Sequence, residues 1–210
     1  PMPVPAPLKT AIQKVLTQGR SGRGATVVFA SGNDDRELGN DEMEAIEKPI
    51  VVAHQGPCVG GGLEISLSCD FRLAAKSASY AFPEGKFGVL PASNGVSRLA
   101  RIVGTHWTRY LIMANLPASA DRALIMGLVH EVFPDESFEE DVMRFCRHLA
   151  GQHAEQMGTA KIAIEMAHDL GLAQARNVER MANSALMLNP DYLAGIERYV
   201  KGIGGKGKSD

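Results

Sequence analysis

The sequence predicts an α/β core followed by a helical C-terminal region. Two short β-branched runs indicate buried strands, at residues 25–30 (ATVVFA) and 49–54 (PIVVAH). A glycine-rich turn over residues 56–62 then leads directly into an apolar segment with helical spacing. From Asn94 onward, almost all apolar residues recur at helical spacing between glycine or proline breaks. Such a succession of strands, turn and helices is typical of a layered α/β domain.

The remaining elements follow from the same two periodicities. Further short, apolar strands are expected at residues 71–75, 79–82 and 129–133. Helices are expected where apolar residues repeat every three or four positions, at residues 8–18, 63–69, 94–103, 105–114, 120–126, 137–151, 155–170, 173–188 and 191–200. Residues 31–40 and 83–93, which contain several glycines or prolines, are expected to form loops.

Composition and charge exclude several classes of protein. The chain has 210 residues, of which 45% are hydrophobic and 22% charged, with a formal net charge of −2. This balance argues against a dedicated nucleic-acid binder, and no apolar run is long enough to cross a membrane. No basic segment followed by an apolar run opens the chain, so we expect no signal peptide. Three scattered cysteines, Cys58, Cys69 and Cys146, favour reduced thiols in a cytoplasmic protein.

The sequence supports neither a phosphate-binding loop nor a metal site. Residues 202–209 match the phosphate-loop pattern GxxxxGK[ST], but that loop must open a helix and only Asp210 follows. The six histidines have no metal-ligand spacing to one another or to cysteine, so we expect no metal site.

The three glycines at residues 60–62 have two interpretations. Glycine accommodates tight strand-to-helix connections, so these residues could serve packing alone. Alternatively, a helix start without side chains leaves backbone N–H groups free to hold an anionic oxygen. Spacing alone leaves both interpretations open.

Two carboxylates lie in mostly apolar segments. Glu64 follows the glycines in the first turn of the expected helix, and Glu84 lies in the segment YAFPEGKF. The simpler explanations are a favourable helix dipole for Glu64 and an ion pair with Lys86 for Glu84. A functional role is the alternative for both, because an acid among apolar residues is either paired or used.

The middle of the chain resembles the crotonase superfamily, the enoyl-CoA hydratase/isomerase family. The resemblance is continuous from about residue 48 to 134 and includes several motifs in the family's order. These motifs are residues 48–56 (KPIVVAHQG), 59–70 (VGGGLEISLSCD), 71–75 (FRLAA), Pro83-Glu84 with Gly88 and Pro91, 99–104 (LARIVG), and Ala123 with 127–129 (GLV).

The resemblance implies a fold of repeated ββα units with a helical C-terminal trimerisation region. Residues 1–134 would form the core, without part of the family's N-terminal strands and first oxyanion loop, and residues 135–210 the helical region. The implied substrates are acyl-CoA thioesters, and the implied assembly is a homotrimer or a dimer of trimers. Coenzyme A arrives as part of the substrate, so no separate cofactor is implied.

The resemblance also implies a role for each candidate residue. The backbone N–H of Gly61 would bind the thioester oxygen in an oxyanion hole, with Gly60 and Gly62 at the substrate. Glu64 would activate water, and Glu84 would act as acid/base at the α-carbon. Isomerases of the family tend to keep only the second acid, so the presence of both favours hydration.

Two points stay open after this comparison. The second oxyanion donor is unplaced: residues 32–34 (GND) are a possible remnant of the family's segment, or that segment is absent. The alternatives to a hydratase are an enoyl-CoA isomerase that uses Glu84 alone, and an inactive acyl-CoA-binding homologue.

Overall fold

The computed structural model describes residues 27–30 and 48–205 of the chain. These residues form two compact units, of which one ends at Ala154 and the other begins at Glu155. None of the described helices combines the length and the apolar character that a bilayer span requires. The helix predicted at residues 8–18 and the loop predicted at 31–40 lie outside the described residues.

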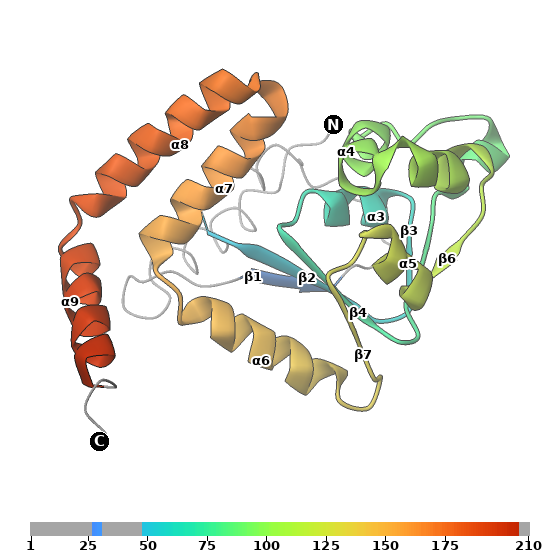
Figure 1. The fold of residues 1–210 in the computed structure, drawn as a ribbon. Helices are drawn as coiled ribbons and strands as arrows, with labels where there is room; N and C mark the ends of the chain where they lie inside the picture. Colours follow the sequence, from blue (N-terminus) through green and yellow to red (C-terminus); the bar gives the residue numbers. More distant parts are fainter. Residues whose placement is uncertain (1–26, 31–47, 206–210) are drawn as a thin grey trace, which may run out of the picture. The chain divides into compact units, whose positions relative to one another are not determined.

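Four parallel strands form the main sheet of the first unit, in the order β1-β2-β4-β7 (Figure 1). Their bounds are Val27–Ala30 for β1, Ile50–His54 for β2, Phe71–Ala75 for β4 and Glu131–Phe133 for β7. The predicted strands in these regions are therefore confirmed. Their apolar sequences suit parallel strands, which are usually covered on both faces.

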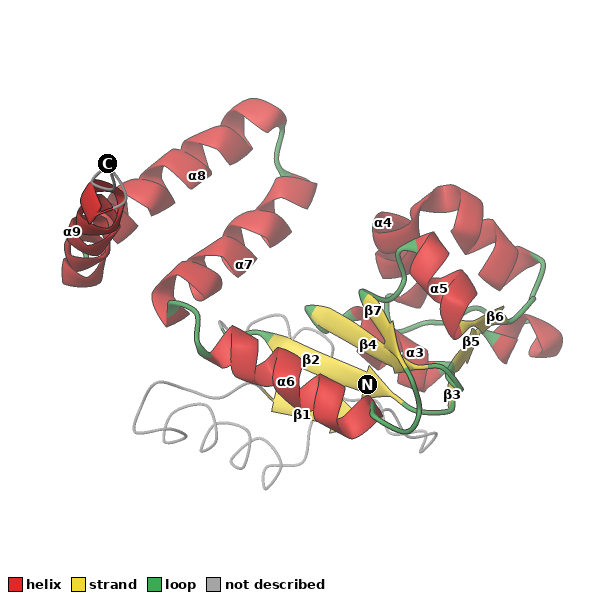
Figure 2. Ribbon diagram, turned by 60° about the horizontal axis from the view of Figure 1, so that its bottom comes forward, coloured by secondary structure: helices red, strands yellow, loops and turns green. Residues whose placement is uncertain are grey.

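Helices cover both faces of this sheet. The helical elements of the first unit are α3 (Gly61–Leu67), the 3-10 helix η1 (Pro83–Phe87), α4 (Gly95–Thr108), the π-helix η2 (Arg109–Met113), α5 (Ala120–Met126) and α6 (Phe138–Ala150). Val51 of β2 packs against α6, which lies along the sheet in Figure 2. Its neighbours Ile50 and Val52 point to the opposite face and pack against Ile65 of α3.

A smaller sheet positions the glycine turn. It consists of β3 (Pro57–Val59), β5 (Ser79–Ala81) and β6 (Ala118–Ser119), with β5 in the centre. Cys58 of β3 and Tyr80 of β5 are register partners, and both side chains are buried. They share a core with Leu63 of α3 and Leu99 of α4. The strand before the turn and the helix after it are therefore fixed by one hydrophobic core.

Three details differ from the predicted elements or refine them. The loop expected at residues 83–93 contains η1, which begins at a proline and ends before Gly88 in the left-handed conformation. The turn expected at 56–62 contains the short strand β3. The predicted break at Gly104 is confirmed by its φ of 72°, but the helix beyond it continues into the π-helix η2.

The second unit consists of α7 (Ala154–Asp169), α8 (Leu172–Met187) and α9 (Pro190–Gly205), which confirms the three predicted helices. Asn189, between α8 and α9, donates a hydrogen bond to Glu155 near the start of α7. The domain boundary proposed after residue 134 stays a prediction. Helix α6 lies beyond that boundary in sequence, and it packs on the sheet of the first unit.

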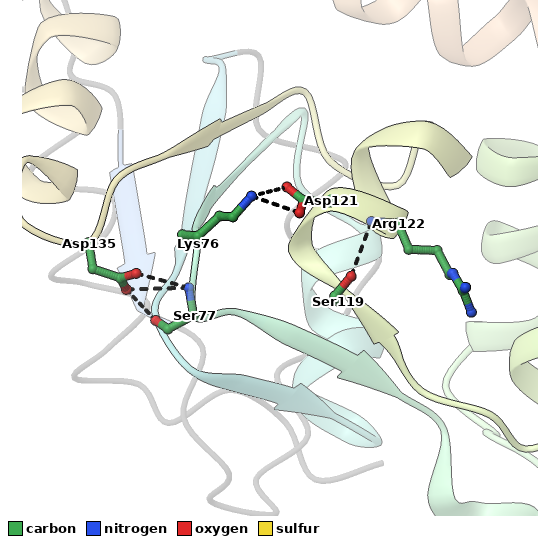
Figure 3. A network of polar contacts seen from close by, with 6 residues as sticks. All are labelled: Lys76, Ser77, Ser119, Asp121, Arg122 and Asp135. Atoms are coloured by element: carbon green, nitrogen blue, oxygen red, sulfur yellow. Dashed lines mark hydrogen bonds and ion pairs between the residues drawn. The ribbon is translucent and has the colours of Figure 1, made fainter.

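Polar contacts on the surface tie the β4–β5 turn to later parts of the first unit (Figure 3). Lys76 Nζ lies 2.6 Å and 2.7 Å from the two carboxylate oxygens of Asp121 in α5. The backbone N–H and the hydroxyl of Ser77 both donate to Asp135, which follows β7. Each exposed pair adds little stability, so these contacts chiefly fix the turn.

Candidate active site

Gly60 is the N-cap of α3 and the centre of the candidate site. Its N–H donates to Ala81 O of β5 at 3.1 Å, and its carbonyl accepts from the N–H groups of Leu63 and Glu64. The φ of Gly60 is 54°, a conformation that favours glycine. A Cβ at this position would also lie only 2.9 Å from Glu84 Oε1. The conformation therefore favours glycine, and any larger residue would also displace the carboxyl group of Glu84.

Gly61 and Gly62 form the first residues of α3. Within the described parts of the chain, neither N–H group donates a hydrogen bond. A Cβ at Gly61 would have no neighbouring heavy atom within 4 Å, so the space beside this backbone is open. The structure thus places free backbone donors at the predicted oxyanion position, where the helix carries a partial positive charge.

The carboxylate of Glu64 contacts the start of a second helix. Its side chain is buried, and Oε1 accepts the backbone N–H of Ser93 at 2.8 Å and of Gly95 at 3.1 Å. Gly95 is the first residue of α4, whose dipole favours negative charge at this end. The simpler explanation, in which Glu64 interacts only with its own helix, is therefore incomplete. Sequence reasoning did not identify these two backbone N–H groups as partners of Glu64.

The carboxyl group of Glu84 lies against Gly60 and has no polar partner among the described residues. Oε1 occupies the space beside the α-carbon of Gly60, and Oε2 is buried without a hydrogen bond. Lys86 is exposed, and no ion pair joins it to Glu84 in the described structure. Burying a polar oxygen without a partner is costly, so a water molecule or a ligand that donates to Oε2 would stabilise this arrangement.

Glu64 and Glu84, 20 positions apart, both contact Gly60, although the carboxyl group of Glu64 itself lies at the start of α4. The N–H of Glu64 binds the carbonyl of Gly60, and the carboxyl group of Glu84 lies against the α-carbon of the same residue. The arrangement combines free N–H donors with two carboxyl groups, which suits stabilisation of an oxyanion and transfer of protons. The segment considered for the second oxyanion donor lies outside the described residues.

His54 supports this turn from the protein interior, and sequence reasoning also missed it. Its ring nitrogens lie 2.9 Å from Ser66 Oγ in α3 and 3.0 Å from Tyr80 Oη in β5. Burial, and to a smaller extent the positive charge of Arg72, lowers the pKa of His54 from 6.5 to about 3. The neutral ring therefore links β2 to α3 and β5. Its one sequence signal is a histidine that ends an otherwise apolar run.

Comparison with known proteins decides the family. The profile of the enoyl-CoA hydratase/isomerase family matches residues 30–202. The chain belongs to this family. It is 31% identical over 164 residues to an enoyl-CoA isomerase/hydratase of Mycosarcoma maydis, covering 76% of this chain and 58% of the relative. It is 28% identical over 159 residues to a crotonyl-CoA hydratase of Syntrophomonas wolfei, covering 76% and 61%.

Solved structures of enoyl-CoA hydratases share the fold. Subunit I of an enzyme from Geobacillus kaustophilus superimposes with a TM-score of 0.75 at 29% identity, covering 77% of this chain and 63% of that one. An enoyl-CoA hydratase from Bacillus anthracis gives a TM-score of 0.81 at 24% identity, covering 95% and 87%. The predicted crotonase-like α/β fold is confirmed. The family member described here spans less than two thirds of the two curated relatives.

Proposed function

We propose that this member of the family is an enoyl-CoA hydratase, which adds water across the α,β-double bond to give a 3-hydroxyacyl-CoA. The observation that carries the proposal is that two glutamates flank one glycine turn. Glu64 bonds Gly60 through its backbone N–H, and the carboxyl group of Glu84 lies against the α-carbon of Gly60. The family match supports an acyl-CoA thioester as the class of substrate. The reaction needs no further cofactor, because coenzyme A enters as part of the substrate.

The glycine turn is the proposed binding site of the reacting thioester. Gly61 donates its N–H to the thioester oxygen, and Gly60 and Gly62 allow the substrate to approach the backbone. Polarisation of this carbonyl makes the β-carbon electrophilic. As the nucleophile adds, negative charge develops on the oxygen, and the N–H group with the positive end of α3 stabilises it.

The two carboxyl groups handle the protons of water. Glu64 removes a proton as the water oxygen bonds to the β-carbon, and its contacts with Ser93 and Gly95 favour the ionised form that this role needs. Glu84 donates a proton to the α-carbon as the enolate collapses. A proton then passes from Glu64 to Glu84 through solvent, which restores both groups for the next turnover.

Isomerisation is the second candidate, because one relative is named an isomerase/hydratase. In that reaction Glu84 alone would remove a proton from one carbon and return it to another. A third candidate is an acyl-CoA-binding protein without turnover.

Hydration of crotonyl-CoA, followed as loss of the conjugated-thioester absorbance, distinguishes these candidates. We expect turnover by the wild type and a fall of about 10²–10⁴-fold in kcat for both Glu64→Gln and Glu84→Gln. Glu139→Gln removes an exposed carboxylate from α6 and is the matched control, with unchanged activity.

The other outcomes contradict the proposal in different ways. An isomerase would be established by three results together. The wild type would not hydrate crotonyl-CoA, Glu84→Gln would lose activity on 3-enoyl-CoA, and Glu64→Gln would keep that activity. Binding of crotonyl-CoA without any turnover, measured by calorimetry, would establish the inactive homologue.

A further inference from the structure

Asn115 contacts the backbone on both sides of Glu84. Its Nδ2 donates a hydrogen bond to the carbonyl of Phe82 at 3.0 Å, across 33 positions of sequence. The same nitrogen would lie 2.5 Å from a Cβ at Gly85, so it packs directly on the α-carbon of that glycine. One side-chain amide therefore holds the residue before Pro83 and the residue after Glu84.

An irregular helix end brings Asn115 to this position. The π-helix η2 ends with the N–H of Ala114 bonded to the carbonyl of Arg109, five residues earlier, at 3.0 Å. Asn115 follows with a φ of 53°, a left-handed conformation that asparagine tolerates better than most residues. A π-turn holds one more residue than an α-turn, and such turns are frequent at functional sites.

The carboxyl group of Glu84 depends on this backbone for its position. No described residue forms a hydrogen bond with it, and its buried Oε2 has no partner. The location of the carboxyl group is therefore set by the backbone of η1 and by the packing against Gly60. A shift of η1 would move the acid relative to the glycine turn.

We infer that Asn115 is a positioning residue for Glu84: its amide fixes the start of η1 and so holds the acid at the α-carbon of the substrate. The inference rests on the proposed role of Glu84. It assigns to Asn115 an effect on turnover, and not only on folding.

Asn115→Gly tests this inference, because glycine tolerates the left-handed backbone and removes the side chain that carries the amide. We expect kcat for crotonyl-CoA hydration to fall about 10–10²-fold, since small displacements of reacting groups have effects of this size, while KM changes less than about threefold. Ser119→Ala is the matched control. It removes the hydroxyl that accepts the N–H of Arg122 at the start of α5 (Figure 3), so it lowers stability without a contact to η1.

A second variant and a double mutant complete the test. Asn115→Asp keeps the shape but replaces the donor by an acceptor, and we expect a similar loss of kcat with native circular dichroism. In the Glu84→Gln background, Asn115→Gly should lower kcat less than twofold further, because the residue acts through Glu84.

The outcomes separate the two proposals. A fully active Glu84→Gln variant would overturn the proposed function itself. A different result would overturn only the role of Asn115. In that case Glu84→Gln is inactive, but Asn115→Gly lowers kcat no more than Ser119→Ala does. Equal losses from Asn115→Gly in both backgrounds would also overturn it, because the effect would then be general.

Discussion

Two glycines in the site provide space for carboxylate oxygens. A Cβ at Gly95 would lie 2.6 Å from Glu64 Oε1, and one at Gly60 would lie 2.9 Å from Glu84 Oε1. A Cβ atom does not approach another heavy atom this closely, so an alanine at either position would displace a carboxyl group. The position of each acid is therefore encoded partly by a residue that has no side chain.

Replacing Gly95 by alanine should move Glu64 away from its two N–H donors. We expect kcat for crotonyl-CoA hydration to fall at least about tenfold, with some loss of stability from the steric conflict. Gly195→Ala is the control, because that glycine lies in α9 with open space around it. It should keep full activity and gain about 0.5–1 kcal/mol of helix stability. A Gly95→Ala variant with wild-type kcat would exclude a catalytic Glu64.

The sequence predicted the acids of the candidate site but not the groups that hold them. Glu64 and Glu84 were recognisable because charged residues are unusual within apolar segments, and the family resemblance added roles to them. The N–H groups that bind Glu64 belong to the backbone, which leaves no residue-type signal. Asn115 is equally hidden, because only the fold brings it to Phe82.

At the level of elements, His54 joins three parts of the first unit. It ends β2, and its ring contacts Ser66 in α3 and Tyr80 in β5. These elements carry the glycine turn and lead to Glu84. Folding therefore requires an uncharged histidine beneath the candidate site.

This requirement predicts acid sensitivity. The pKa of His54 is lowered from 6.5 to about 3 by burial, so between these values the unfolded chain binds a proton that the folded chain does not. The free energy of unfolding should fall as pH drops through this window, by up to about 1.4 kcal/mol per pH unit from this residue. His54→Gln should be less stable at pH 7 and lose that slope in urea unfolding from pH 7 to 4.5. His148→Gln, at an exposed position, is the control, and an unchanged slope in His54→Gln would contradict the assignment.

Regular elements were predictable where one periodicity extended over the whole element. The strand at residues 71–75 and the helix α6 agree with their predicted ranges because each buries an unbroken apolar face. The 3-10 helix η1 was not predicted, and η2 lies within the helix predicted at residues 105–114, whose π form was not predicted. Neither has a distinct apolar period, since η1 spans five residues and η2 continues the spacing of α4.

At the level of the whole molecule, the second unit has many exposed apolar side chains. The most exposed are Ile164, Leu172, Met181, Leu188, Leu193, Tyr199 and Val200. Exposed apolar side chains in such number favour burial against a partner. Together with the family, it supports the proposal that the chain forms a homotrimer or a dimer of trimers.

We expect light scattering to give three or six times the mass of one chain. Leu193→Asp places a charge on the apolar surface of α9 and should lower the measured mass at micromolar concentration, because burying that charge in an interface is costly. Glu197→Lys on the same helix is the control for a charge change at an exposed position. A monomeric wild type would contradict the proposed assembly.

The parallel order of the main sheet has a consequence during synthesis of the chain. β4 ends at Ala75, but its outer neighbour β7 begins only at Glu131, 56 positions later (131 − 75). At roughly 5–20 residues per second, a ribosome needs about 3–11 s to make the intervening segment. During this time one edge of β4 lacks the partner it has in the finished protein, and unpaired edges can pair with other chains. The nascent protein therefore carries an unpaired edge of β4 until β7 emerges.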